Sequence, residues 1–324
     1  MKIIYKSVFL LSFLFSFNCY SQDNQDLIVA DLLRIADGFA DPAANSVAYQ
    51  ANGGWFSSAQ SMDPWQFEVS VHGNAVFVPN SRKNYIIDNL EVLTIRGDES
   101  RAVVPTAFGS SSEVVFEGVY ESALGDFPFD FEAIEGIDKS LVGHPFAQIT
   151  VGLPAETEFA VRLMPAITVG DVKVNTYGAG VKHNFSQYLR FNEPEDFQFS
   201  AFVAYSLFDI QYEFTPLDLQ PLVELNAIEV DADVWVAELL GSKRYADFEI
   251  FGALGVASSN FAYMMEGSGA ALSDINSALG SLGDSEAQFK GDIGFNIYLN
   301  RFKISTMATA GRFFNLNLGL HFRI

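Results

Sequence analysis

Histidine is the side chain that most often transfers protons in enzymes, and this chain of 324 residues contains four: His72, His144, His183 and His321. Hydrolysis with a serine nucleophile needs a histidine beside the serine and an acid or amide that orients the imidazole ring. None of the four histidines belongs to a Gly-x-Ser-x-Gly or His-x-x-Glu-His arrangement. The sequence therefore predicts no catalytic residue and no enzymatic activity.

The sequence gives as little support to metal or thiol chemistry as to histidine catalysis. The one cysteine, Cys19, lies in an N-terminal segment that we expect to be removed, which excludes disulfides, thiolate catalysis and cysteine metal sites from the mature chain. An acidic run over 126–138 sets five carboxylates among phenylalanines: Asp126, Asp130, Glu132, Glu135 and Asp138. A divalent cation site is one interpretation, but the spacing matches no EF-hand loop. We expect a solvated acidic loop, no metal and no cofactor.

A set of ionisable residues falls at alternate positions of extended segments, on the side opposite the apolar residues. The set consists of Glu68, His72, Arg162, Lys182, Lys290, Asp292, His321 and Arg323. If the segments close into a barrel, these side chains line the lumen, and the first and last strands become neighbours. Because an unpaired charge in a narrow lumen is costly, pairing of opposite charges is the structural interpretation, and contact with a substrate is the functional one.

Alternation of apolar and polar residues is the strongest pattern in the chain. In the segment 65–71, Trp65, Phe67, Val69 and Val71 share one face, and the same alternation runs over 314–324 to the last residue. Segments of about ten residues with this period, separated by turns, are typical of transmembrane barrels, whose strands face lipid on one side and the lumen on the other. We predict an all-β fold, a transmembrane antiparallel β-barrel of about 10–14 strands.

Ten segments follow this pattern, and their links alternate in length. The segments lie near 65–78, 144–153, 157–164, 172–183, 197–208, 227–238, 246–257, 288–299, 302–310 and 313–324. Short links follow the second, sixth and eighth segments, and long links follow the first, fifth and seventh. Two links fit less well, because the one around Gly311–Arg312 is short for an outer loop and the one over 184–196 is long for a periplasmic turn. Because short turns of such barrels are periplasmic and long loops are extracellular, both barrel ends fall in the periplasm. The segments 90–95 and 113–119 are candidates for a further hairpin that would raise the count to twelve.

A soluble β-sandwich is the alternative, since its strands alternate as well. Sandwich strands usually run about five or six residues, whereas these runs reach ten or more. The segment 314–322 would span about 26 Å, or about 20 Å of height at a tilt near 40°. Charged residues make up 18% of the chain, which is low for a soluble domain. These observations favour the membrane barrel.

The N-terminal 64 residues divide into two parts. A basic start and an apolar run over 8–17 predict a signal peptide, residues 1–21, with lipidation of Cys19 as the less favoured alternative. Residues 22–64 form a helical cap or hatch, and 65–324 form the barrel. Without Lys2 and Lys6, 17 basic residues oppose 40 acidic ones, so the formal charge falls from -21 to -23. Such acidity excludes nucleic acid as a partner.

Two apolar patterns of helical spacing lie outside the strands. In the cap segment, Ile28, Leu32, Ile35, Ala36 and Phe39 would share a helix face, and Gly38 with Asp41–Pro42 predicts a stop. An ordinary cap and a moving hatch are equally compatible with this helix. The second pattern, in a predicted mouth loop, consists of Leu272, Ile275, Leu279 and Leu282. This helix would either collect a hydrophobic ligand or pack on other loop residues.

The C-terminal alternation resembles the insertion signal of outer-membrane barrels, although it ends on Ile324 rather than on phenylalanine or tryptophan. A short N-terminal segment followed by a barrel resembles the FadL-like long-chain fatty-acid transporters and related outer-membrane families. Those barrels have fourteen strands and a hatch motif, Asn-Pro-Ala-Gly, of which Ala51-Asn52-Gly53-Gly54 is a loose echo.

This resemblance implies passive transport of small hydrophobic compounds across the outer membrane of a Gram-negative bacterium. The expected partners are outer-membrane lipid, the barrel-insertion machinery and a hydrophobic small molecule. The alternative is a structural or surface-exposed outer-membrane barrel without transport.

Overall fold

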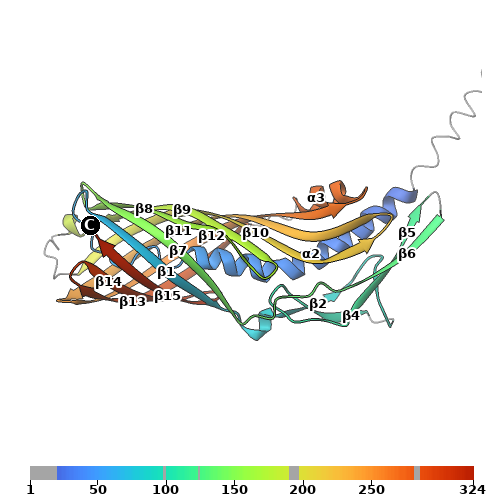
Figure 1. Cartoon of the computed structure of the whole chain (residues 1–324), viewed down its shortest axis with the longest axis horizontal. Helices are drawn as coiled ribbons and strands as arrows, with labels where there is room; N and C mark the ends of the chain where they lie inside the picture. The colour runs from blue at the N-terminus through green and yellow to red at the C-terminus, as the bar shows by residue number, and fades with distance from the viewer. Residues whose placement is uncertain (1–19, 98–99, 123–124, 190–196, 281–284) are drawn as a thin grey trace, which may run out of the picture.

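The computed structural model describes residues 20–324 except 98–99, 123–124, 190–196 and 281–284. Ten antiparallel strands close into a barrel in the order β1-β15-β14-β13-β12-β11-β10-β9-β8-β7 (Figure 1). Their bounds are β1 (Phe67–Phe77), β7 (Leu141–Leu153), β8 (Thr157–Val169), β9 (Val172–Asn184), β10 (Gln198–Leu219), β11 (Val223–Tyr245), β12 (Phe248–Ser268), β13 (Ser285–Leu299), β14 (Phe302–Ala310) and β15 (Phe314–Arg323). The predicted fold class is confirmed, with ten strands. The predicted signal peptide lies almost wholly outside the described residues.

The outer face of the barrel wall is apolar, and the inner face carries most of the wall's polar and charged side chains, together with a buried apolar cluster around Phe202. On β15, Leu316, Leu318 and Leu320 are 43–57% exposed, whereas Asn315 and His321 on the opposite face are at most 4% exposed. Such a wall crosses a membrane through strands, because closure pairs every backbone group and the apolar exterior meets lipid. The protein is therefore an outer-membrane barrel. Among the described residues, no helix has the length and apolar character to cross a membrane.

Aromatic side chains mark the two edges of the membrane-facing band. The rings of Tyr205 and Trp235 lie 4.6 Å apart toward the extracellular end, and those of Phe302 and Phe322 lie 5.0 Å apart at the periplasmic end. Two residues before Trp235, the same outward face of β11 carries Asp233. The change from aromatic to carboxylate side chains places the outer membrane surface near this level.

Three strands continue well beyond this level. β10, β11 and β12 contain 22, 23 and 21 residues, against 9–15 in the other barrel strands. The link from β1 to β7 adds η1 (Asn80–Arg82) and two small sheets. These are β2 (Asn84–Asp88) with β4 (Arg101–Pro105), and β3 (Thr94–Ile95) with β5 (Val115–Ser122) and β6 (Gly125–Glu132). The segments 90–95 and 113–119 thus pair outside the wall instead of widening the barrel.

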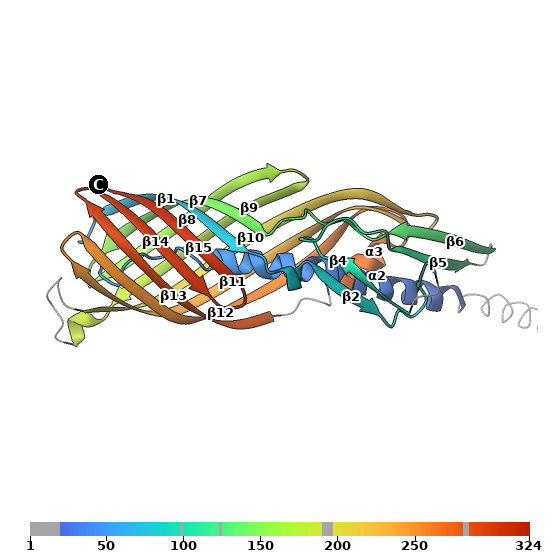
Figure 2. The ribbon, with the colours of Figure 1, turned by 90° about the horizontal axis from the view of Figure 1, so that it is seen from below.

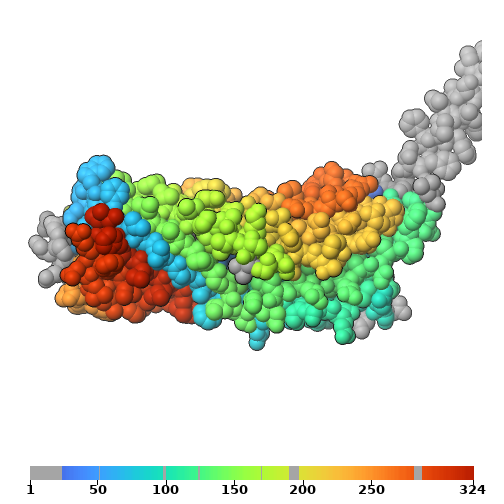
Figure 3. All heavy atoms as spheres, in the orientation of Figure 1, coloured from blue at the N-terminus to red at the C-terminus, as the bar shows by residue number. Residues whose placement is uncertain are grey.

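The projecting strands, the small sheets and α3 (Leu272–Leu279) surround the first half of α2 (Tyr20–Ala51), as Figures 1 and 2 show. We call this assembly the extracellular module. Its core contains Ile28, Leu32 and Phe39 of α2. The space-filling view shows barrel and module as one continuous elongated body (Figure 3). On the periplasmic side, the link from β9 to β10 contains η2 (Ser186–Tyr188).

The predicted helix stop at Gly38 and Asp41–Pro42 is wrong, because α2 continues through Pro42 to Ala51. Proline removes one helical hydrogen bond, but nearby carbonyls gain partners from outside the helix. The Tyr85 hydroxyl donates to the Ile35 carbonyl at 2.9 Å, and the Ala107 amide donates to the Phe39 carbonyl at 2.9 Å. Glycine at 38 makes room for the Tyr85 ring, which a Cβ would approach to 2.3 Å.

Candidate functional site: the plugged lumen

The lumen is filled by the chain's own N-terminal segment. We call residues 42–64 the plug; they comprise the end of α2, from Pro42 to Ala51, and the irregular segment that leads to β1. Ala44, Ala48 and Tyr49 of the plug are at most 2% exposed, so the helix fits closely inside the wall. Gly54 adopts φ +73°, and a Cβ there would lie 2.5 Å from the Asn317 amide on β15. Glycine therefore lets the plug pass directly against the wall.

Side chains of the wall hold the irregular backbone of the plug. Lys182 donates from Nζ to the Ser58 and Gln60 carbonyls at 2.9 Å each. Lys290 donates in the same way to the Asn52 carbonyl at 2.9 Å. Backbone without secondary structure is tolerated at membrane depth only where such partners satisfy it. The inward lysines thus bind the plug by hydrogen bonds as well as neutralising neighbouring acids.

The inward charges form compact ion-pair clusters. At one level, Lys290 Nζ lies 2.7 Å from Glu238 Oε1 and 3.0 Å from Asp292 Oδ2, and all three side chains are fully buried. At another, Lys182 Nζ lies 2.9 Å from Glu158 Oε2. Pairing of this kind offsets much of the desolvation penalty of charges taken into a narrow interior.

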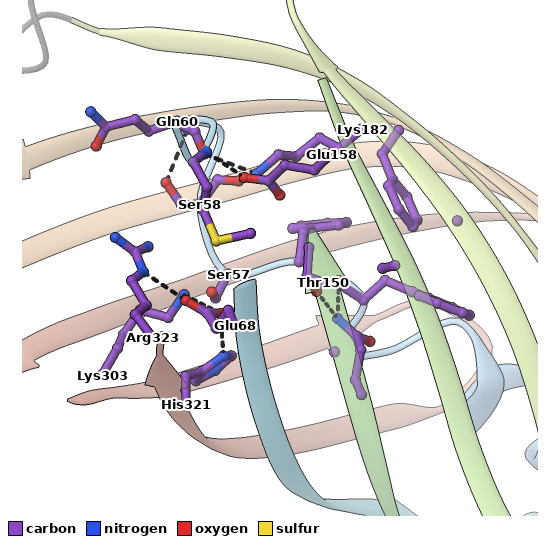
Figure 4. A pocket seen from close by; sticks show the side chains of 18 residues that line it. Ser57, Ser58, Gln60, Glu68, Thr150, Glu158, Lys182, Lys303, His321 and Arg323 are labelled. Carbon is purple, nitrogen blue, oxygen red and sulfur yellow. Dashed lines mark hydrogen bonds and ion pairs between the residues drawn. The ribbon is translucent and has the colours of Figure 1, made fainter. Parts of the chain in front are cut away.

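The seam between the first and last strands holds a third cluster, shown in Figure 4. Glu68 on β1 accepts from Lys303 Nζ at 2.9 Å and from Arg323 Nε at 2.8 Å. His321 Nδ1 lies 2.7 Å from the same carboxylate. Register explains the meeting, because Glu68 is the direct partner of Arg323.

An arginine joins the plug to the wall through aromatic rings. The Arg162 guanidinium lies 3.9 Å from the centre of the Trp55 ring and 3.8 Å from that of Phe146. Trp55 belongs to the plug and Phe146 to β7, so the cation is stacked between the two. Desolvated cation–π contacts contribute about 2 kcal/mol each. Arg162 therefore fastens the plug rather than facing open solvent.

Two serine–histidine relays lie in the same region, and sequence patterns indicated neither. Ser305 Oγ lies 2.8 Å from Nε2 of His321, and Nδ1 of the same ring lies 2.7 Å from the Glu68 carboxylate. Likewise, Ser70 Oγ lies 2.9 Å from His72 Nε2, and His72 Nδ1 lies 3.0 Å from Asn317 Oδ1. This is the connectivity of a hydrolytic triad.

Space around the first relay limits what it can do. Ser305 is 3% exposed, and the adjoining cavity at the periplasmic end of the lumen holds about 30 Å³. That volume suits one or two waters and not an acyl group. Lys303 and Ser305 were not among the sequence candidates, although alternation over 302–310 sets both on the inward face.

The structure brings all eight predicted lumen residues inside the wall; seven are at most 7% exposed, and Arg323 is partly exposed at the periplasmic mouth. In the mouth helix, Ile275 and Leu279 are buried in the core around α2, and Leu272 packs at its edge. Leu282 lies outside the described residues. Of the two roles left open by the sequence, α3 therefore takes packing on other residues. Within α3, the buried apolar residues present no free face to a ligand.

The acidic run 126–138 is partly paired. Asp130 pairs with Arg96, and Asp138 lies 3.1 Å from Lys83 Nζ. A separate group, Asp209, Glu229 and Asp231, places carboxylate oxygens within 4.8 Å of one another on the projecting strands. Partial burial and, next, the neighbouring carboxylate of Asp209 raise the pKa of both Glu229 and Asp231. Partial burial and repulsion among like charges thus both act on this group.

Comparisons with solved structures find distant barrels. The translocator domain of the autotransporter NalP from Neisseria meningitidis has 8% identity and a TM-score of 0.37, over 89% of this chain and 97% of that one. The beta domain of the Bordetella autotransporter BrkA has 8% identity and a TM-score of 0.38, over 80% and 99%. The COG4313 outer membrane channel from Pseudomonas putida F1 has 10% identity and a TM-score of 0.33, over 82% and 98%.

These likenesses are too distant to carry an inference about activity. No curated protein matches the chain. A family profile, in contrast, matches residues 1–324 over their whole length. The chain belongs to the family of unknown function DUF6588.

Proposed function

We propose that this protein is a sealed outer-membrane anchor that holds a folded module at the cell surface. The observation that carries the proposal is the plug, which leaves a cavity of about 30 Å³ at the periplasmic end of the lumen. A hydrated ion or a small hydrophobic compound needs a continuous path of several ångströms in width. Hydrogen bonds from Lys182 and Lys290 and the cation–π contact of Arg162 with Trp55 hold the plug in that path.

One helix serves both parts of the molecule. Its residues before Pro42 supply Ile28 and Phe39 to the core of the extracellular module, and its residues from Pro42 onward supply Ala48 and Tyr49 to the plug. Displacing the plug would therefore also disturb the core of the module. This coupling favours a permanent connection over a hatch that opens during transport.

Passive transport of hydrophobic compounds, as in the FadL-like transporters, remains the second proposal. An N-terminal segment inside the lumen is the feature that favours it. Ten strands enclose a narrower lumen than the fourteen of that family, and transport would require Lys182 and Lys290 to release the plug backbone. We also propose that the hydrogen bonds of Ser305 and His321 are structural rather than catalytic. The C-terminal strand directs insertion of the barrel into the outer membrane, and the acidic protein does not bind nucleic acid.

Conductance in planar bilayers tests the proposal. The purified wild-type protein should be silent, whereas a variant with residues 54–62 replaced by glycine and serine of equal length should open channels. That replacement removes Trp55 and Phe56, which fill the lumen against Phe202. A matched control replaces the extracellular segment 109–113 in the same way and should stay silent. Steady wild-type channels of the same conductance as the plug variant would overturn the sealed anchor and favour transport.

A further inference from the structure

The lipid-facing wall has a trench near its periplasmic end, formed by two adjacent glycines. Gly241 on β11 and Gly252 on β12 are direct cross-strand partners, and both face outward. In the same row, Gly241 is paired with Phe199 on β10 and Gly252 with Ile293 on β13. In this row, two glycines therefore lie between two bulky side chains, those of Phe199 and Ile293. With strands about 4.8 Å apart, the floor is two strands wide.

Apolar residues close the trench along its length. Leu239 and Leu254 stand at its extracellular end, and Ile250 stands toward the periplasm. The hollow has a volume of about 820 Å³, within the range of pockets that hold small ligands. Its lining is mainly aliphatic and aromatic, so the occupant must be apolar over most of its length.

The fold itself does not require glycine at 241. Neither Gly241 nor Gly252 has a positive φ. A Cβ at 241 would meet its nearest atoms, in the Phe199 ring, at an ordinary 3.7 Å. At 252 the nearest atom would be the Asp292 carbonyl oxygen at 3.1 Å, a tighter but single contact. A larger side chain at 241 is therefore compatible with the backbone, and its absence leaves space that the strands do not use.

The surroundings of the trench are hydrocarbon. Leu254 is 74% exposed, Ile293 66% and Leu239 64%, which is the exposure of side chains that contact lipid tails. Water has no favourable partners there. An alkyl chain from the membrane fits the shape and polarity of the hollow.

One cation stands at the periplasmic end of the trench. Lys243 Nζ lies 4.8 Å from the centre of the Phe197 ring and 5.7 Å from that of Tyr245. Among the residues that the structure describes, no carboxylate lies within ion-pair distance of it. Lysine at this depth extends its ammonium toward the headgroup layer. A cation that has no carboxylate partner within the described part of the chain, at the end of an apolar trench, complements a phosphate.

We propose that this trench binds a phospholipid of the periplasmic leaflet, with one acyl chain over Gly241 and Gly252 and the phosphate paired with Lys243. A second copy of the chain is the competing occupant, because closely approaching protein surfaces also favour glycine. The cation at headgroup depth favours the lipid, since the outward neighbours of Lys243 offer a second copy no carboxylate within the described residues.

Native mass spectrometry of the full chain, titrated with phosphatidylglycerol, tests the site. Gly241→Leu fills the trench, and Lys243→Gln removes the cation. Ala147→Leu is the matched control for bulk, because Ala147 faces lipid on β7, away from the trench. Arg301→Gln is the matched control for charge, in the periplasmic turn between β13 and β14. A heat-sensitive shift in electrophoretic mobility verifies that each variant has a folded barrel.

The wild-type protein and both controls should retain one phosphatidylglycerol. Gly241→Leu should weaken its binding at least about tenfold, the scale of a misfit in an apolar pocket. Lys243→Gln should abolish the preference for phosphatidylglycerol over a diacylglycerol with the same acyl chains. Unchanged binding in a folded Gly241→Leu variant overturns the proposal. A wild-type dimer that Gly241→Leu dissociates also overturns it and assigns the trench to a second copy.

Discussion

The buried ion pairs of the lumen stabilise the fold only when each charge keeps a partner of opposite sign. Lys290 neutralises Glu238 and Asp292 and also binds the plug backbone at Asn52. Removing the cation leaves two carboxylates buried without compensation. Removing one carboxylate leaves an ion pair.

Lys290→Met should therefore lower the free energy of unfolding by about 3–5 kcal/mol. Glu238→Gln should lower it by less, because the Lys290–Asp292 pair survives. Urea unfolding in lipid vesicles, followed by tryptophan fluorescence, measures both. Equal losses in the two variants would contradict the fastening role of Lys290.

Removing a charge from the acidic group Asp209, Glu229 and Asp231 on the projecting strands should raise the free energy of unfolding instead of lowering it. The pKa of Asp231 is raised in the folded protein, so its ionisation at neutral pH destabilises the fold. Asp231→Asn should raise the free energy of unfolding at pH 7 by about 0.5 kcal/mol, as for partly screened surface charges. This gain should disappear as the pH falls below about 4, where the carboxyl is protonated in both states.

Thermal unfolding at about pH 3 and at pH 7 measures this difference. Asp247→Asn, in the periplasmic turn between β11 and β12, is the control and should not change stability in the same pH-dependent way. A gain from Asp231→Asn that is the same at both values would show that charge repulsion is not its cause.

At the scale of elements, α2 is the part on which both halves of the molecule depend. Its passage through Pro42 relies on contacts with Tyr85 and Ala107 in the link between β1 and β7. The link in turn packs on the helix, since the Tyr85 ring lies against Gly38. Helix and link therefore stabilise each other.

Gly38→Ala should destabilise the extracellular module by about 1–3 kcal/mol, because the added methyl overlaps the Tyr85 ring. Limited proteolysis of intact cells, followed by mapping of cleavage within 78–140, measures the effect. Gly73→Ala is the control, since a Cβ there has no atom within 4 Å. Equal protease resistance in both variants would contradict the proposed packing.

At the scale of the whole molecule, the direction of α2 fixes where the N-terminal end of the helix lies. The end of β15 and the turns that join β7 to β8, β11 to β12 and β13 to β14 lie at one end of the barrel, and the start of α2 lies on the other side, with the extracellular module (Figures 1 and 2). After the plug, the chain reaches the periplasmic end and begins β1. The exposed start of α2 should therefore be accessible from outside the cell.

A cysteine at Asp26, which is exposed near the start of α2, should react with a membrane-impermeant maleimide on intact cells. A cysteine at Glu156, in the periplasmic turn between β7 and β8, should react only after the outer membrane is permeabilised. The wild-type chain, without an added cysteine, supplies the background labelling. Labelling of position 156 but not 26 in intact cells would reverse the orientation.

The sequence by itself determined the wall, because the two faces of a strand are read directly from alternate residues. The sequence also predicts that Glu68 and His321 meet, because closure of the barrel makes the first and last strands neighbours. Only the tertiary structure decided three further features. These are the continuation of α2 through Pro42, the contact of Trp55 with Arg162 and the hydrogen bond from Lys182 to the Ser58 carbonyl. These contacts join residues far apart in the chain, and they depend on how much space the closed barrel leaves inside. No local pattern encodes that space, whereas the preference of each strand face for lipid or lumen is a local property.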